Sequence, residues 1–215
     1  MRLLSLFLLS MTCGLAQAAV DISDSLLDSI DQRYGRDAHN RVVDWQRLMK
    51  GILAKPELQD QPKITDANDF FNRVKWISDQ DHWGQEDYWA TPVETLVTNG
   101  GDCEDFSIAK YFTLNTTGID SEKLRITYVK ALDYNQAHMV LAYYSSPDAE
   151  PLILDNINKT ILPASQRKDL LPIYSFNGES LWLAKARGRK LNANSQASLP
   201  QWRGVNERML QELQQ

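Results

Sequence analysis

The spacing of hydrophobic residues changes from a helical to a strand-like period about half way along the chain. Between residues 21 and 53, apolar side chains recur every three or four positions, as in an amphipathic helix. This stripe consists of Ala38, Val42, Trp45, Met49 and Ile52. Gly35 interrupts the stretch, so we predict two helices with a break at this glycine.

Further helices are predicted before the change of period. Pro56 and Pro62 indicate a linker, after which Thr65 is expected to cap a helix. The apolar face of that helix would carry Phe70, Val74 and Ile77. Residues 91–94 then read Thr-Pro-Val-Glu, which is the cap, first-turn proline and acidic first turn of a short helix that stops at residues 99–101.

Beyond Gly118 the apolar residues alternate with polar ones, which predicts β-strands. The expected strands are 125–130, 137–144, 152–155, 173–176 and 181–184. Val205 and Met209 are spaced as in one last amphipathic helix. Helices first and an antiparallel sheet afterwards predict an α+β fold.

The composition narrows the classes of protein to which the chain can belong. Of its 215 residues, 43% are hydrophobic, as in a globular protein. The net charge of −5 argues against nucleic acid or an anionic membrane surface as the partner. No stretch approaches the roughly 20 apolar residues that a membrane helix needs, so we expect no membrane insertion of the mature protein.

The first 18 residues have the pattern of a secretory signal peptide. Arg2 precedes a short apolar run, and residues 16–18 read Ala-Gln-Ala, a small-x-small cleavage site. Cys13 would leave with this segment, and Thr12 is larger than the residue that usually precedes a lipidated cysteine. We therefore predict an exported protein with a single domain over residues 19–215.

Cys103 would then be the only cysteine of the mature chain, and it cannot form an internal disulfide. It follows Gly100, Gly101 and Asp102 at the predicted start of a helix, where the helix dipole favours a thiolate. Asp102 and Asp105 are spaced as a reciprocal cap, so the same stretch also fits a well-capped helix with a small buried residue.

A cysteine nucleophile needs a base, and the base needs an orienting group. His138 begins a predicted strand and can face the start of the cysteine helix, whereas His39 lies in an early helix and His82 in the irregular stretch 79–92. Asp155 ends the next strand, which would bring it beside His138. Cys103, His138 and Asp155 are therefore the candidate nucleophile, base and orienting carboxylate.

The acidic residues around the cysteine suggest a metal site. Asp102, Glu104 and Asp105 place negative charge where a thiolate should form, and like charge raises the pKa of a thiol. A hard cation would remove this conflict, and carboxylates favour Ca²⁺ over Zn²⁺. Helix capping by acidic residues is the alternative explanation. The backbone N–H of Cys103 would supply half of an oxyanion hole, with a second donor in the loop 83–89.

With these residues in place, the chain resembles the bacterial transglutaminase-like cysteine proteinases, and among them the LapG-type periplasmic proteases. The resemblance extends from about residue 74 to about residue 182. Its blocks are residues 87–96, 100–105 with Ser107, Ala109 and Lys110, 137–141, 151–156, 166–170 and 174–177.

The resemblance implies a papain-like, transglutaminase-type core with Cys103, His138 and Asp155 as the triad. It also implies calcium dependence, with Asp102 and Glu104 as ligands and Asp105 as a further one. The substrate would be the N-terminal region of a large surface adhesin, cut beside an alanine pair so that the biofilm disperses. An inner-membrane receptor for cyclic di-GMP would sequester the protease through its periplasmic domain.

Two other functions share the same residues. A transglutaminase-type acyl transferase would use the same triad but pass the acyl group to an amine. A calcium-responsive binding module would use Cys103 only structurally, and the complete set of cysteine, histidine and aspartate argues against it.

Overall fold

The computed structural model describes residues 20–178, 180–183 and 189–213. The signal-peptide prediction for residues 1–18 therefore lies outside the described residues. The first half is helical, with α2 (Asp24–Tyr34), α3 (Arg36–Leu53), α4 (Asp60–Phe71), α5 (Asp79–His82), α6 (Pro92–Thr98) and α7 (Cys103–Thr116). A two-stranded parallel pair, β1 (Lys75–Trp76) and β2 (Gly100–Gly101), lies among these helices.

The second half forms an antiparallel sheet with the order β6-β5-β4-β3-β7-β8-β9. Its strands are β3 (Leu124–Ala131), β4 (Gln136–Tyr143), β5 (Leu152–Leu154), β6 (Leu162–Pro163), β7 (Leu170–Phe176), β8 (Ser180–Leu183) and β9 (Arg189–Asn194). One short 3₁₀ turn, η1 (Ser121–Lys123), precedes β3, and another, η2 (Ala164–Gln166), lies between β6 and β7. The helices α8 (Ser195–Ser198) and α9 (Pro200–Leu213) follow the sheet. The α+β prediction is confirmed.

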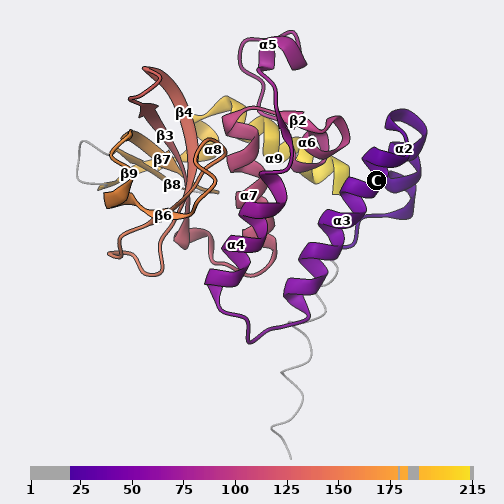
Figure 1. Cartoon of the computed structure of the whole chain (residues 1–215), viewed down its shortest axis with the longest axis horizontal. Coiled ribbons are helices and arrows are strands. Elements are labelled where there is room, and N and C mark those ends of the chain that lie inside the picture. Colours follow the sequence, from indigo (N-terminus) through magenta and orange to yellow (C-terminus); the bar gives the residue numbers. More distant parts are fainter. Residues whose placement is uncertain (1–19, 179, 184–188, 214–215) are drawn as a thin grey trace, which may run out of the picture.

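The helices and the sheet form two adjoining parts with α7 between them (Figure 1). One core cluster lies among the helices and includes Val42, Trp45 and Phe106. A second cluster lies between α7 and the sheet and includes Ile108, Leu141 and Phe176. Because α7 contributes to both clusters, its first turn is fixed relative to the strands that carry His138 and Asp155.

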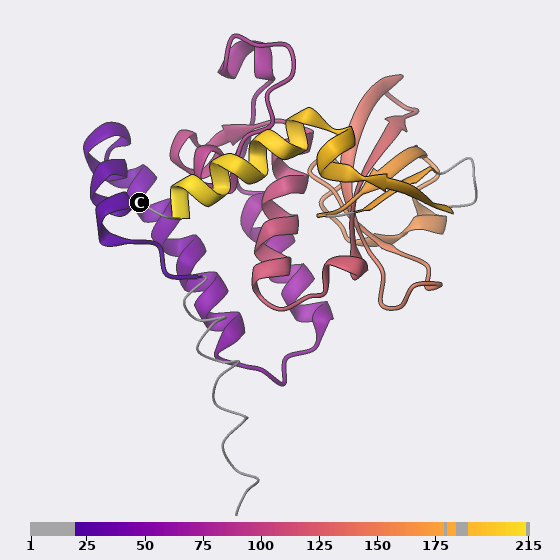
Figure 2. The ribbon, with the colours of Figure 1, turned by 180° about the vertical axis from the view of Figure 1, so that it is seen from behind.

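The last helix ties the two parts together. Figure 2 shows α9 running from the sheet across the helices towards α2 and α3. Trp202 of α9 is fully buried and stacks on Phe112 with ring centroids 5.5 Å apart. Val205 and Met209 are buried too, which confirms the predicted amphipathic helix.

The prediction for α4 was wrong at both ends. The helix begins at Asp60 after Gln59, so Pro62 lies in the first turn, where proline is tolerated because that N–H has no partner within the helix. Thr65 is not the cap; its hydroxyl donates to the Gln61 carbonyl at 3.0 Å. The helix ends at Phe71, so Val74 and Ile77 lie outside it.

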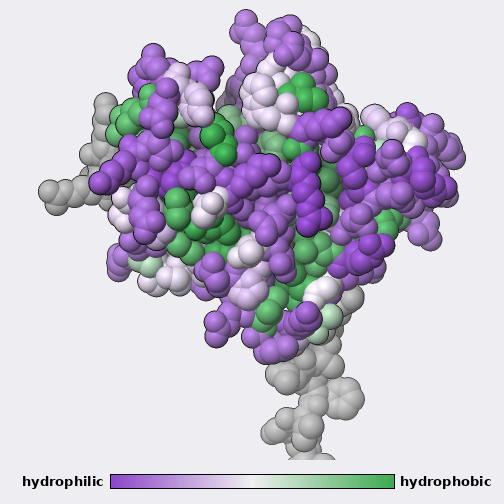
Figure 3. Space-filling view, viewed as in Figure 1, coloured by the Kyte–Doolittle hydropathy of each residue, from purple (hydrophilic) through white to green (hydrophobic). Residues whose placement is uncertain are grey.

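The surface is mostly hydrophilic on the face in Figure 3, and its apolar residues form separate patches. Among the described residues, no helix combines the length and the apolar character that crossing a membrane requires.

Candidate active site

The start of α7 depends on two glycines that bring backbone and side chains unusually close. A Cβ atom on Gly101 would lie 2.7 Å from Asp105 Oδ2, and one on Gly100 would lie 2.5 Å from His82 Cε1. Larger residues would displace these neighbours. The pairing of β2 with β1 then leads the chain directly into Asp102 and the first residue of the helix, Cys103.

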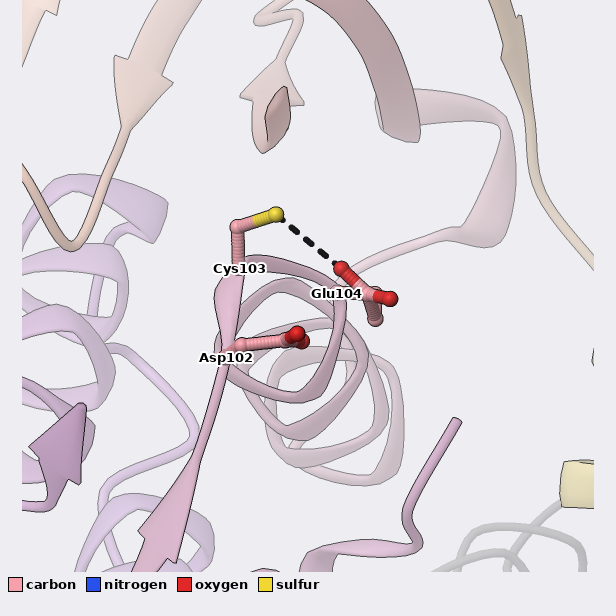
Figure 4. A group of neighbouring side chains, drawn as sticks. All are labelled: Asp102, Cys103 and Glu104. Atoms are coloured by element: carbon pink, nitrogen blue, oxygen red, sulfur yellow. Dashed lines mark hydrogen bonds between the residues drawn. The ribbon is translucent and has the colours of Figure 1, made fainter. Parts of the chain in front are cut away.

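Cys103 is half-buried at this helix start, and its thiol donates a hydrogen bond to Glu104 Oε2 at 3.0 Å (Figure 4). Burial and the neighbouring Glu104 and Asp102 carboxylates raise the pKa of the thiol well above its usual value. The backbone N–H of Met139 faces the sulfur and lowers the pKa in part. The sulfur therefore lies against β4, next to the residue that follows His138.

The predicted pairing of His138 with Asp155 is present. Both side chains are buried, and His138 Nε2 lies 2.8 Å from Asp155 Oδ1. Burial would raise the pKa of Asp155, but hydrogen bonds from His138, the Ile157 N–H and Arg167 hold it well below its usual range. An ionised carboxylate only accepts hydrogen bonds, so Nε2 is the donor of this contact and Nδ1 is the ring nitrogen left to exchange a proton.

The backbone of Asp155 is fixed as well. Its carbonyl accepts hydrogen bonds from Asn72 Nδ2 at 3.0 Å and from Lys110 Nζ at 3.2 Å. Lys110 lies on α7 and also donates to Asn72 Oδ1 at 2.9 Å. Burial lowers the pKa of Lys110 to about 7. The cysteine helix and the carboxylate of the candidate triad therefore share one buried polar network.

The predicted acidic cluster is larger than the sequence indicated. Asp79 and Asp87 join Asp102, Glu104 and Asp105, and their oxygens form groups of three within 4.8 Å of one another. Asp102, Cys103 and Glu104 form a further such group. Asp79 begins α5, and Asp87 lies in the following loop, so both come from the irregular stretch 79–92.

These carboxylates have the properties of a cation site. Burial, and to a smaller extent the negative charge of Glu104, raises the pKa of Asp102 to about 9. Burial raises the pKa of Glu104 to about 7. Asp79 Oδ1 and Asp102 Oδ1 are buried without a hydrogen-bond partner among the described residues. Unpaired carboxylate oxygens at this density suit a hard divalent cation such as Ca²⁺, so the donor set fits the predicted metal.

Asp105 has a different environment from the other acids. Its Oδ1 accepts the Ala90 N–H at 2.7 Å, and its Oδ2 accepts the Asp102 N–H at 3.2 Å. The second contact is the predicted reciprocal cap. Asp105 thus fixes the loop before α6 and the residue before Cys103, besides lying within reach of Asp79 and Asp102.

Sequence reasoning missed four residues of this region: Asp79, Asp87, Asn72 and Arg167. The irregular mixture of charge and aromatic residues in 79–92 was a sign of function for the first two. Asn72 lies 83 residues and Arg167 lies 12 residues from Asp155 along the chain, and no periodic pattern marks such contacts.

Comparison with known proteins identifies similar chains. The family model described as "Bacterial transglutaminase-like cysteine proteinase BTLCP" matches residues 45–182. A structure of Legionella pneumophila LapG is 43% identical with a TM-score of 0.75, and the alignment covers 90% of this chain and 99% of that chain.

Two further Legionella pneumophila LapG structures differ in their treatment. The calcium-bound one is 42% identical with a TM-score of 0.74, and the alignment covers 87% of this chain and 99% of that one. The EGTA-treated one is 41% identical with a TM-score of 0.73, and the alignment covers 85% of this chain and 97% of that one. Among curated protein sequences, no match was found.

Proposed function

Because the chain belongs to the bacterial transglutaminase-like cysteine proteinase family, we propose that it is a calcium-dependent cysteine endopeptidase of the LapG type. The observation that carries this proposal is the buried hydrogen bond between His138 and Asp155. His138 lies on β4, and the next residue of that strand contacts the sulfur of Cys103. These are the three roles that nucleophilic catalysis by a thiol requires.

In the proposed reaction, His138 Nδ1 takes the proton of Cys103, and the sulfur attacks a peptide carbonyl carbon. The protonated imidazole then gives its proton to the leaving amine, which leaves a thioester on Cys103. Water, deprotonated by His138, hydrolyses the thioester and restores the thiol. The Cys103 backbone N–H at the start of α7 is one donor for the developing oxyanion.

Asp79, Asp87, Asp102 and Glu104 would hold the calcium ion, which would offset their negative charge beside the thiol. Support comes from their unpaired buried oxygens and from the calcium-bound structure of Legionella pneumophila LapG. Asp105 would then brace Asp102 and Ala90. Glu104 accepts the thiol hydrogen bond in this arrangement, so the position of its carboxylate affects Cys103 directly.

The biological setting is part of the proposal. Residues 1–18 direct the chain to the periplasm, where the enzyme cuts the N-terminal region of a large surface adhesin and so promotes biofilm dispersal. The periplasmic domain of an inner-membrane cyclic di-GMP receptor inhibits it by sequestration. The likeness to LapG at over 40% identity across most of the chain supports this setting.

The test is cleavage of a purified adhesin N-terminal fragment by the wild type and by Cys103→Ala. We expect the variant to lose cleavage while it still binds the receptor domain, because only the sulfur is removed. His39→Ala, which changes a histidine of α3, is the control that should cleave normally. Cleavage by Cys103→Ala would refute the protease. Incorporation of a labelled amine in place of hydrolysis would assign the acyl transferase instead.

A further inference from the structure

We propose that Arg167 is a positioning residue of this active site: by fixing the Asp155 carboxylate, its guanidinium holds the His138 imidazole in the orientation that proton transfer requires. The inference rests on the proposed function, in which His138 moves the proton. Arg167 lies just after η2, where only residues 166–170 of the family resemblance had marked it.

The two oxygens of Asp155 have separate partners. Oδ1 accepts His138 Nε2 at 2.8 Å and the Ile157 N–H at 2.9 Å. Oδ2 accepts Arg167 Nη2 at 2.7 Å. Rotation of the carboxylate about its Cβ–Cγ bond would break both sets of contacts at once. The guanidinium therefore restricts the torsion that sets the direction of the bond to His138.

Arg167 is itself held in place. Its Nε donates to Asp169 Oδ1 at 3.0 Å and its Nη2 to Asp169 Oδ2 at 2.7 Å, so Asp169 binds one edge of the guanidinium through two hydrogen bonds. The Asp169 carbonyl accepts the Leu132 N–H at 2.8 Å, which ties this segment to the turn between β3 and β4. The same turn leads into the strand that carries His138.

Because both side chains are buried, losing the contact between Arg167 and Asp155 would be costly. The side chains of Arg167 and Asp155 are 2% and 0% exposed, whereas that of Asp169 is 35% exposed. Removing the guanidinium would leave a buried carboxylate with an uncompensated charge. A lysine would keep the charge but not the planar fork that contacts both aspartates, so it should replace arginine only in part.

The charges in this group also favour the reaction. With His138 neutral, one guanidinium faces two carboxylates, Asp155 and Asp169. When His138 takes the proton of Cys103, its imidazolium adds a second positive group beside Asp155. Arg167 thus shares its charge with Asp169, and Asp155 remains available to stabilise the imidazolium.

The experiment compares the wild type with Arg167→Met and Arg167→Lys. It measures kcat and KM on the adhesin fragment and the rate at which iodoacetamide alkylates Cys103, followed by mass spectrometry. A misplaced base should lower kcat and the alkylation rate of Arg167→Met by about 10- to 100-fold and leave KM within about twofold. Arg167→Lys should lie between that variant and the wild type.

A double variant separates positioning from a general structural effect. If Arg167 acts through Asp155, Arg167→Met combined with Asp155→Asn should be no slower than Asp155→Asn alone. Multiplying losses in the double variant, or a wild-type alkylation rate in folded Arg167→Met, would overturn the proposal. Arg125→Met is the matched control. Its guanidinium on β3 stacks on Tyr144 and Trp182, so its loss should leave alkylation unchanged.

If circular dichroism shows that Arg167→Met does not fold, Asp169→Asn provides the test instead. This variant weakens the hold on Arg167 but leaves the buried pair of Arg167 and Asp155 in place. It should slow alkylation in the same direction but less, and an unchanged rate would count against the proposal. Alkylation needs no peptide substrate. A wild type that cannot cleave the adhesin fragment would therefore refute the proposed function, while the alkylation series still tests the role of Arg167.

Discussion

Gly101 lies against the side chain of Asp105, whose two oxygens fix Ala90 and Asp102. A methyl group at this glycine would lie 2.7 Å from Asp105 Oδ2 and 2.8 Å from Asp105 Cβ, closer than side-chain atoms approach. Because Asp105 is fully buried, it has little room to move away. The glycine therefore permits the approach on which the turn into Cys103 depends.

Gly101→Ala should destabilise the protein by about 1–3 kcal/mol, the usual cost of overpacking a buried site. Because the shift of Asp105 would also displace Asp102, activity should fall more than the loss of folded protein explains. Urea unfolding and active-site titration of Cys103 measure the two effects.

Gly51→Ala is the matched control for this substitution. Gly51 lies within α3, and nothing would lie within 4 Å of an added Cβ atom. Alanine has the higher helix propensity, so this variant should be more stable by about 0.5–1 kcal/mol. Equal effects of the two substitutions would show that the contact with Asp105 does not matter.

The sequence was informative wherever partners are close along the chain. The reciprocal cap of Asp102 and Asp105 was predicted because a capping box has a fixed spacing of three residues. Thr91 was predicted as the cap of its helix, with Glu94 in the acidic first turn. Asp79 and Arg167 were missed because they meet Asp102 and Asp155 only after the chain has folded back. The candidate triad itself was found through residue chemistry and strand order rather than through periodicity.

At the scale of the elements, Thr91 joins the first turn of α6 to the last helix, α9. Thr91 Oγ1 accepts the Glu94 N–H at 3.1 Å and donates to Glu212 Oε1 of α9 at 2.8 Å. Burial raises the pKa of Glu212 to about 7. Gln201 of α9 also donates to Asp87 Oδ2 at 3.0 Å. The last helix therefore supports the loop that supplies Asp87 and the Ala90 N–H.

Thr91→Val should cost about 1–2 kcal/mol of stability, because it removes a helix cap and the hydroxyl that donates to Glu212. The shape of the side chain hardly changes, so packing is preserved. Urea unfolding measures the loss.

Thr95→Val is the control on the same helix. Thr95 is also fully buried, but its hydroxyl only donates back to the Thr91 carbonyl at 2.9 Å, a backbone group that the helix already satisfies. We expect a clearly smaller loss for it. An equal loss would mean that burying any valine here is costly and that the cap contributes nothing of its own.

Element boundaries were predicted less well than element types. The central strands β3, β4 and β5 were expected within two residues, because their side chains alternate between the two faces. The edge strands β6 and β9 were not predicted. β6 has two residues, and β9 carries polar residues such as Arg189 and Lys190, as edge strands often do.

Over the whole molecule, the acidic cluster beside Cys103 links charge to stability. The chain has a net charge of −5, and five carboxylates gather beside Cys103. A carboxyl whose pKa is raised on folding destabilises the folded protein once the pH exceeds its unfolded value near 4. For Asp102, with a pKa of about 9, this cost is present at pH 7 unless a cation is bound.

Asp102→Asn should therefore change stability in opposite directions with and without calcium. In EGTA the variant should unfold at a higher temperature than the wild type, because an amide neither carries a buried charge nor has to take up a proton on folding. In calcium it should gain much less than the wild type, because it lacks a ligand and binding energy adds to stability. Differential scanning fluorimetry in EGTA and in millimolar calcium measures both increments.

Asp44→Asn is the matched control, since Asp44 is an exposed residue of α3 paired with Arg47. Calcium should raise its unfolding temperature as much as that of the wild type. An exposed carboxylate outside the cluster neither binds the ion nor loses hydration on folding. The explanation of the cluster as a cation site requires that only Asp102→Asn loses the increment. If calcium raised the unfolding temperature of all three proteins equally, the ion would bind elsewhere, and the acids beside Cys103 would be helix caps.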